Sequence, residues 1–515
     1  MAVKGGRVRG VRRDDLWTFS GIPYGRAPVG ALRWRPPEAP EPWDGVRDAS
    51  SFGPIAPQAA GIPGFAGLSD PQDGELQSED CLSLNIWTPD VPDRPSPVGA
   101  RAVMVWIHGG GFTGGSGSNF LYRGAKLARQ GDLVVVTINY RLGALGFLGH
   151  RALADPDGYV GNWGLHDQVA ALEWVRDHIA LFGGDSSNVT VFGESAGGFS
   201  VATLLGTPGA TGLFRRAIVQ SGGVHVHTVA EGERTAERVT ELLGLTSCDR
   251  AALESVSAQD LVEATTVVSE RPPDPGLVPL PHLPIVDHRF LPEHPMAAIE
   301  RGAARNVELL IGTNKDELTL FGLGNPVLGS LDEPTLELLA GFAAPDMPTA
   351  EMIETYRAAR LARDEPVAPL NLWWAMGGDD VFRWRSLQLA AAQRAHGASA
   401  YVYLFDWESP ALGGVLGSCH ALEIPFVFGA VDLPVVQMFT GTGPLVEALS
   451  AEMLASWIAF AHSGDPTTER HWPIWEPDAR ATMVFGPNSG VAQRPRDAEL
   501  AVWEQYRPLV AGRQT

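Results

Sequence analysis

The chain has 515 residues, which suits one large α/β unit or about three domains of average size. Hydrophobic residues make up 44% and charged residues 19%, so the chain can bury a large core, and disordered, collagen-like and coiled-coil proteins are excluded. The 60 acidic and 39 basic residues give a formal net charge of −21, which repels phosphate backbones and anionic lipids. We therefore expect no nucleic-acid and no membrane partner, and a small-molecule substrate that is neutral, weakly cationic or largely apolar.

The cysteines and the N-terminal residues indicate a cytoplasmic location. Cys81, Cys248 and Cys419 show neither a Cys-x-x-Cys pair nor a metal-ligand spacing. The first residues are too charged and too rich in glycine for a signal peptide, and no run of about 18 apolar residues occurs. The sequence therefore predicts a cytoplasmic protein without a membrane span or a metal.

The first predicted elements are short. Residues 16–30 are typical of a strand followed by turns, and residues 52–77 of a loop with several Pro and Gly. Long loops in compact domains usually carry function, so this loop is expected to rim a cleft.

An α/β rhythm follows. Helical patterns occupy residues 119–130 and 165–182. Six apolar runs predict buried strands at residues 102–108, 133–139, 188–192, 217–220, 308–312 and 401–405. Strands that alternate with helices predict a doubly wound, mostly parallel sheet.

About residues 222–305 depart from this rhythm. The sequence there is mostly helical from Thr228 to Asp274 and rich in proline from Pro272 to Pro284, so we expect an excursion from the sheet that forms a cap. Another helix is expected at residues 446–460. No linker divides the chain, which predicts a single domain over residues 1–515.

The first chemical signal is Gly193-Glu194-Ser195-Ala196-Gly197, directly after a predicted strand. A nucleophilic serine between a strand and a helix needs a strained turn, and small residues two positions away on either side let the backbone form it. A Gly-x-Ser-x-Gly pattern alone is weak, and the alternative is an ordinary glycine-rich turn. The strand before it and the small residues after it favour the nucleophile.

The second signal is a glycine run, His108-Gly109-Gly110-Gly111-Phe112, again at a strand end. Consecutive glycines let backbone N–H groups approach a tetrahedral oxyanion closely. A phosphate-binding P-loop is excluded because no Gly-Lys-Ser/Thr follows. A dinucleotide-binding loop stays an alternative, since the spacing of Gly109, Gly111 and Gly114 fits its fingerprint, although the following residues continue as loop.

A serine nucleophile also needs a base and a carboxylate that orients the base. Of 13 histidines, His420 follows a predicted strand, whereas surface or capping positions are expected for His225, His227, His282 and His288. The carboxylate candidates are Asp316 and Glu317, which adjacency alone does not separate. The chain order serine, acid, histidine is that of α/β-hydrolases.

With these residues in place, the sequence resembles the type B carboxylesterase family, which includes cholinesterases and para-nitrobenzyl esterases. The resemblance runs nearly from end to end. It is carried by Phe19-Ser-Gly-Ile-Pro-Tyr-Gly, Leu32-Arg-Trp near Trp43-Asp-Gly, Ser78-Glu-Asp-Cys-Leu-Ser-Leu-Asn-Ile-Trp87, Asn139-Tyr-Arg-Leu-Gly, Gly161-Asn-Trp-Gly-Leu-His-Asp-Gln168, Phe182-Gly-Gly-Asp185 and Phe426-Val-Phe-Gly.

The resemblance implies an α/β-hydrolase fold and a relay of Ser195 as nucleophile, His420 as general acid/base and Glu317, rather than Asp316, as the orienting acid. It implies no cofactor and no metal. The oxyanion donors would be the backbone N–H groups of Gly110, Gly111 and Ala196. A buried supporting set would consist of Glu194, Ser221 and Glu423, for which plain packing is the equal alternative.

The sequence also departs from its relatives. Many of them have a cysteine near residues 56–58 that would bond to the residue matching Cys81, but Ala56 stands there. The loop before Cys81 lacks the tryptophan that holds a quaternary ammonium in cholinesterases, so a choline ester is not expected. Cys419 is expected to be a small buried residue rather than a nucleophile.

The expected activity is that of a serine carboxylesterase, which hydrolyses neutral carboxylic esters through an acyl-enzyme. The rivals are an amide or carbamate hydrolase with the same triad, a lipase, and a non-catalytic binding protein of this fold. Substrate pockets are expected in the loops at residues 52–77, 265–290 and 321–333. Four aromatic residues could line the site, although core packing is the more common role: Trp373, Trp374, Phe382 and Trp384.

Overall fold

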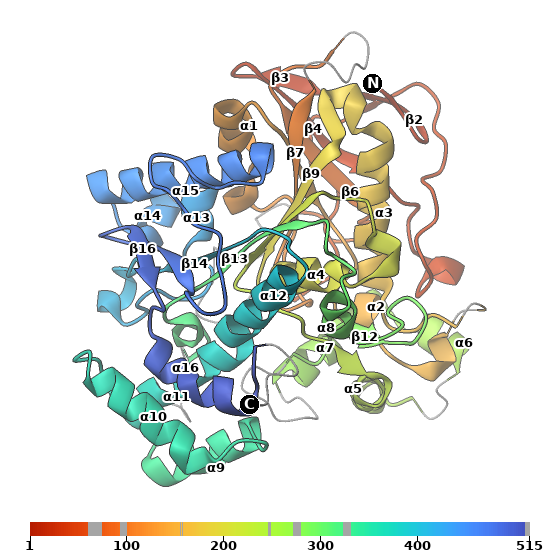
Figure 1. Ribbon diagram of the computed structural model, residues 1–515. Coiled ribbons are helices and arrows are strands. Elements are labelled where there is room, and N and C mark those ends of the chain that lie inside the picture. The colour runs from red at the N-terminus through yellow and green to blue at the C-terminus, as the bar shows by residue number, and fades with distance from the viewer. Residues whose placement is uncertain are drawn as a thin grey trace.

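The computed structural model of the chain describes residues 1–59, 75–92, 100–154, 156, 158–245, 249–270, 280–322 and 331–509. At its centre lies a twisted eleven-stranded sheet with helices on both faces (Figure 1). In spatial order its strands are β16 (Gly490–Gln493), β15 (Ala481–Phe485), β14 (Ala400–Phe405), β13 (Glu308–Asn314), β10 (Arg216–Gln220), β9 (Gly184–Glu194), β7 (Arg101–Ile107), β8 (Val134–Ile138), β6 (Ser83–Thr88), β4 (Leu16–Pro23) and β3 (Val11–Arg13).

The seven strands from β15 to β8 run parallel, and the strands at both edges are antiparallel to their neighbours. The six strands predicted from apolar runs are β7, β8, β9, β10, β13 and β14, so the predicted α/β class is confirmed. β15, which runs parallel to β14, and the antiparallel β3, β6 and β16 were not predicted, because each adjoins another strand with no described helix between them and so does not extend the α/β rhythm. A separate three-stranded sheet joins β1 (Ala2–Val3), β2 (Gly6–Arg9) and β5 (Val46–Asp48).

Alternation along the buried strands creates two helical layers. On β7, Val103, Val105 and Ile107 pack in the same apolar cluster as α3 (Trp163–His178), α4 (Ala196–Leu205) and α12 (Trp384–Ala395). The intervening Met104 and Trp106 pack in a second cluster with α1 (Ala125–Gly131), α13 (Ile424–Val427) and α15 (Pro444–Ser463). Because every side chain of these strands meets apolar neighbours, the runs show no polar alternation.

Residues 222–305 lie between β10 and β13 of the sheet (Figure 1). Outside the undescribed residues 246–248 and 271–279, they contain α5 (Val229–Leu242), α6 (Arg250–Glu254), α7 (Ala258–Glu270), α8 (Pro295–Glu300) and the small strand pair β11 (His227–Thr228) and β12 (Ile285–Val286). Apolar residues of α5, α6 and α7 form a third cluster with α2 (Gly143–Phe147). The excursion therefore packs on α2, Trp34 and Trp163 through a shared apolar cluster.

The last part of the chain adds α9 (Glu333–Ala343), α10 (Thr349–Leu361), α11 (Pro369–Gly378), α14 (Pro434–Thr440) and α16 (Asp497–Tyr506). In Figure 1, α9 and α10 lie at the edge of the molecule, with α16 beside α10.

One described helix, α15, is long and apolar enough to cross a membrane by length and composition, with a mean hydropathy of 1.3. Half of that window is buried within the protein, and Met453, Trp457 and Phe460 share the second apolar cluster with Trp106 of the sheet. This packing accounts for its apolar composition as that of a core helix.

Candidate active site

Ser195 occupies the tight turn between β9 and α4. Its φ of +56° and ψ of −125° lie in a region that non-glycine residues rarely adopt. A Cβ atom on Gly193 would lie 2.6 Å from the backbone carbon of Gly197, and a Cβ on Gly197 would collide with the carbonyl oxygen of Ile107. Both glycines of the motif are therefore required by close backbone contacts, as expected of a nucleophile turn.

The glycine run after β7 lies against this turn. A Cβ atom on Gly109 would lie 3.1 Å from the Cβ of Ser195. Gly110 and Gly111 have φ values of +110° and +61°. Among the described residues, the backbone N–H groups of Gly110, Gly111 and Ala196 donate no hydrogen bond to another backbone group outside the helices and strands. Three such donors beside a serine are suited to an oxyanion.

Glu317 and His420 form a close buried pair. The imidazole Nδ1 donates to Glu317 Oε2 at 2.6 Å, while Glu317 Oε1 accepts the backbone N–H of Asn314 at 2.8 Å. Glu317 begins a short 3-10 helix (Glu317–Gly322), and His420 follows the loop after β14. Asp316 does not contact the imidazole but accepts a hydrogen bond from the backbone of Ser418.

The other ring nitrogen of His420 faces a second carboxylate. Its Nε2 lies 3.1 Å from Glu194 Oε1, and the bond to Ser195 Oγ that the resemblance implies is not formed among the described residues. A buried carboxylate attracts the imidazole more strongly than a neutral hydroxyl does, which explains the difference. Since Glu194 and Ser195 are consecutive, the imidazole still lies next to the serine turn.

The carboxylates around His420 change the pKa of its imidazole. Burial alone would lower the pKa of His420, but the carboxylates of Glu194 and Glu317 outweigh burial and raise it. Burial also raises the pKa of Glu194. The pair of Glu194 and His420 therefore keeps a proton to higher pH than a free imidazole would.

Glu423 and Ser221 are the other two residues of the expected supporting set. Glu423 is fully buried and accepts hydrogen bonds from Gln220 Nε2 at 3.0 Å and from Asn314 Nδ2 at 2.7 Å. Burial, together with Glu317, raises the pKa of Glu423. Ser221 is buried with a φ of +44°, and its backbone N–H donates to Gly312 O, so it fixes the end of β10.

Aromatic rings flank the imidazole. The ring centroids of Phe321 and Phe382 lie 5.1 Å and 4.8 Å from that of His420. Phe382 belongs to a π-helical turn (Asp379–Arg383), a feature often found at functional sites. Of the four aromatic residues considered above, Phe382 thus lies at the site, whereas Trp384 is a core residue whose Nε1 donates to Arg507 O.

The expected pocket loops are described only in part, because residues 60–74, 271–279 and 323–330 lie outside the described residues. Two described residues of these loops reach the site, Phe321 beside the imidazole and Leu280 beside the glycine run. Leu280 Cδ2 lies 3.6 Å from a Cβ position on Gly111. This contact places the start of the described part of that loop beside the candidate oxyanion donors.

Sequence reasoning missed two amides and misplaced one histidine. Asn314 and Gln220 hold Glu423 in place, and the only signal for them was their position at the ends of predicted strands. His282, which was expected at the surface or at a cap, is fully buried, and burial lowers its pKa to about 3. Its apolar neighbours Leu280 and Leu283 explain why.

The two described cysteines, Cys81 and Cys419, are buried free thiols, and burial raises the pKa of each. Such thiols are poor nucleophiles, in line with the expectation for Cys419. Cys248 lies outside the described residues. Within the described part of the chain, no group of three or more His, Cys, Asp or Glu side chains could hold a metal ion.

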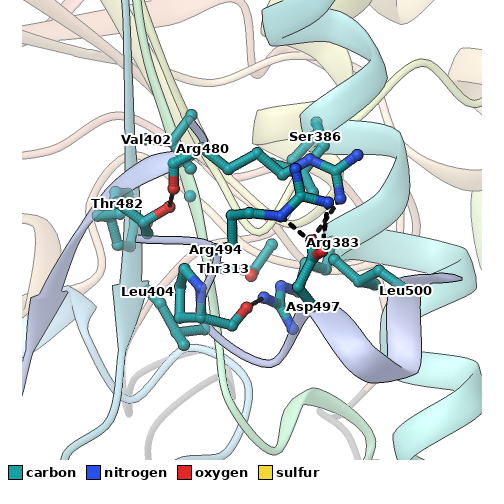
Figure 2. Close-up of a pocket in the computed structure, with 14 residues that line it drawn as sticks. Thr313, Arg383, Ser386, Val402, Leu404, Arg480, Thr482, Arg494, Asp497 and Leu500 are labelled. Carbon is teal, nitrogen blue, oxygen red and sulfur yellow. Dashed lines mark hydrogen bonds and ion pairs between the residues drawn. The ribbon is translucent and has the colours of Figure 1, made fainter. Parts of the chain in front are cut away.

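A pocket lies between the sheet and α12 (Figure 2). Its guanidinium groups are already engaged, since Arg480 and Arg494 both bind Asp497 and Arg383 donates to Pro495 O. None of the predicted site residues lines it. Its lining is Gly312, Thr313, Arg383, Ser386, Leu387, Val402, Tyr403, Leu404, Arg480, Thr482, Arg494, Pro495, Asp497 and Leu500.

Comparisons with known proteins identify the family of the chain. The chain matches the Carboxylesterase family over residues 1–503. It is 38% identical to a para-nitrobenzyl esterase from Bacillus subtilis, with 95% of both chains covered, and 35% identical to a phenmedipham hydrolase from Pseudarthrobacter oxydans, again with 95% of both chains covered.

Solved structures give the same result. A carboxylesterase from Geobacillus stearothermophilus superposes with a TM-score of 0.85 at 40% identity, covering 97% of this chain and 99% of the other. A para-nitrobenzyl esterase structure superposes with a TM-score of 0.81 at 37% identity, covering 97% and 99%. The sheet is thus that of an α/β-hydrolase, and the chain belongs to the carboxylesterase family of carboxylic ester hydrolases.

Proposed function

We propose that this carboxylesterase hydrolyses esters with Ser195 as nucleophile, His420 as general acid/base and Glu317 as the residue that orients the imidazole. The observation that carries the proposal is the 2.6 Å hydrogen bond between His420 and Glu317 next to the strained turn of Ser195. A nucleophile, an orienting acid and a base, which follow one another along the chain as Ser195, Glu317 and His420, are the parts that acyl transfer needs.

In the first step His420 Nε2 moves from Glu194 to the Ser195 hydroxyl and accepts its proton as the oxygen attacks the ester carbonyl. The resulting oxyanion receives hydrogen bonds from the backbone of Gly110, Gly111 and Ala196. Glu317 stabilises the imidazolium that forms. His420 then protonates the alcohol as it leaves, and an acyl-enzyme remains.

In the second step a water molecule replaces the alcohol. His420 takes a proton from this water, which attacks the acyl carbon, and then returns the proton to Ser195 as the acid is released. Each step uses the same three donors, because a tetrahedral oxyanion forms twice.

Replacement of single residues tests the assignment directly. In Ser195→Ala, hydrolysis of a short para-nitrophenyl ester and labelling by an organophosphate should both disappear. Ser187→Ala, which changes an exposed serine, is the matched control and should keep both. Hydrolysis at the wild-type rate in Ser195→Ala would refute the assignment.

For the substrate, we propose neutral esters of modest size. Phe321 and Phe382 beside the imidazole and Leu280 beside Gly111 offer apolar contacts, which suit aryl or short acyl groups. A panel of para-nitrophenyl esters of increasing acyl length measures this preference. Faster hydrolysis of long-chain emulsions than of soluble short-chain esters would instead indicate a lipase.

An amide or carbamate hydrolase is the second candidate, and the 35% identical relative named as a phenmedipham hydrolase favours it. The triad is common to both reactions, but amide cleavage demands better protonation of the leaving nitrogen. Rates on an ester and on the anilide of the same acid distinguish them. A higher rate on the anilide would overturn the ester assignment.

We also propose a cytoplasmic location. The support is chemical, since Cys81 and Cys419 are free thiols and Ala56 replaces the cysteine that many relatives pair with the residue matching Cys81. Fractionation of cells that produce the full chain tests it, and recovery of the protein in an exported fraction would contradict it.

A further inference from the structure

Two segments of the chain carry the acid and the histidine, and they are bound to each other. We call residues 314–319 the acid segment and residues 416–420 the histidine segment. Asn314 Nδ2 donates to Cys419 O at 2.7 Å, the Asp316 N–H donates to Ser418 O at 2.9 Å, and Thr319 Oγ1 donates to Leu416 O at 2.6 Å. The histidine segment thus rests on the acid segment along its whole length.

Asp316 adds a side-chain bond to this arrangement. Its Oδ2 accepts the backbone N–H of Ser418 at 2.9 Å, so Asp316 and Ser418 exchange two hydrogen bonds. Gly417 has a φ of +57°, and a Cβ atom there would collide with Asp316 Oδ2. The carboxylate therefore occupies the space that a side chain at position 417 would fill.

Lys315 balances the charge of this carboxylate. Its Nζ lies 2.6 Å from Asp406 Oδ1, 2.8 Å from Glu408 Oε1 and 3.8 Å from Asp316 Oδ2. The backbone N–H of Lys315 also donates to Phe405 O, the last residue of β14. The strand that leads to the histidine segment is thereby fixed at its end as well.

We propose that Asp316 is a positioning residue for His420. By holding Ser418, two residues before the histidine, it sets the histidine segment where the imidazole meets Glu317 and can reach Ser195. Asp316 acts through the backbone and touches neither substrate nor reacting atoms. The proposal rests on the proposed function, because it concerns the orientation of the base in that reaction.

The size of the expected effect follows from how sensitive such reactions are to geometry. A displacement of about 1 Å in a catalytic group can cost on the order of 100-fold in rate. Loss of one of several bonds between the segments should therefore lower kcat about 10- to 100-fold and leave KM within about threefold.

Four variants in the full chain separate position from charge and folding. Asp316→Ala removes the acceptor of the Ser418 N–H and should show the full loss of about 10- to 100-fold in kcat. Asp316→Asn keeps an oxygen acceptor for Ser418 and should stay within about threefold of wild type. Asp316→Glu keeps the charge but moves the carboxylate, and should lose activity. Glu408→Ala removes another carboxylate partner of Lys315 without touching the histidine segment, and should be unaffected.

Rates are measured on a para-nitrophenyl ester and divided by the number of active serines titrated with an organophosphate, so that misfolded protein does not count. The pH profile is the second readout. A displaced imidazole loses contact with Glu317, so the acid limb of kcat/KM in Asp316→Ala should shift to lower pH, which a smaller folded fraction would not cause.

Wild-type kcat per titrated serine in both Asp316→Ala and Asp316→Glu would overturn the proposal. An equal loss in Glu408→Ala, or an Asp316→Asn as impaired as Asp316→Ala, would overturn it as well, because charge would then be responsible. Failure of the proposed function looks different: Ser195→Ala would keep wild-type hydrolysis, whatever the Asp316 variants do.

Discussion

The serine side and the histidine side of the site are held in place by different means. Ser195 is fixed by backbone sterics, because Gly193 and Gly197 leave no room for a side chain. His420 is fixed by a hydrogen bond from its Nδ1 to Glu317 and by the charge of Glu194 beside its Nε2. The position of Ser195 should therefore not depend on pH, and the turn should tolerate no side chain at Gly193 or Gly197. The protonation of His420 should instead change when a nearby charge is removed.

The largest expected effect is the loss of kcat on replacing Ser195 or His420, and it shows whether the two residues act together. Ser195→Ala and His420→Ala should each lower kcat by about 10⁴- to 10⁶-fold, and the double variant should lose no more than either single variant. Steady-state kinetics on a para-nitrophenyl ester measure this. His471→Ala, an exposed histidine, serves as control, and additive losses in the double variant would show two independent roles.

The next largest effect is expected for Glu317, the carboxylate bound to His420 Nδ1. Glu317→Gln keeps the shape of the side chain but cannot stabilise the imidazolium, so kcat should fall about 10³- to 10⁴-fold with little change in KM. A loss below tenfold would mean that Glu194, on the other ring nitrogen, takes over this role.

The serine side should fail through packing rather than charge. A methyl group at position 197 meets the carbonyl of Ile107, and we expect Gly197→Ala to destabilise the fold by about 3 kcal/mol, roughly 100-fold in the unfolding equilibrium. Urea unfolding measures this loss. Gly490→Ala, where a Cβ atom would meet nothing within 4 Å, is the control and should be nearly neutral.

The smallest effect is a shift in pH dependence. His420 must be neutral to accept the serine proton, and the nearby carboxylates raise its pKa above the ordinary 6.5. Activity should therefore fall as pH is lowered through an apparent pKa above that value, and rise towards alkaline pH. In Glu194→Gln the acid limb of kcat/KM should move down by about one pH unit. An unchanged acid limb would mean that the charge of Glu194 does not act on His420.

The sequence was sufficient for the parts that short patterns encode. Apolar runs located six of the seven parallel strands because these strands are covered on both faces. Gly-x-Ser-x-Gly located the turn because its two glycines are needed where the backbone of the turn packs closely on itself and on Ile107. The antiparallel β4 was expected from residues 16–30, whereas β3, β6, β15 and β16 were missed because each adjoins another strand with no described helix between them.

Contacts between distant segments were beyond such patterns. Nothing in the adjacency of Asp316 and Glu317 tells which carboxylate reaches the imidazole, since that depends on the loop after β14. The position of Glu194 against His420 Nε2 was equally hidden, because it arises where β9 and the histidine segment converge. A resemblance to known relatives pointed to Glu317, but not to the bond between Asp316 and Ser418.

The route of residues 222–305 has a practical consequence. This stretch departs from β10 and rejoins at β13, two neighbouring parallel strands whose carboxyl ends bind Glu423 and Glu317, and it shares an apolar cluster with α2, Trp34 and Trp163. Its exchange for the equivalent stretch of a relative would keep β10 and β13 paired if the new stretch also packs against α2, Trp34 and Trp163. Grafting at these two borders is therefore the natural way to redirect the enzyme to other esters while its chemistry is kept.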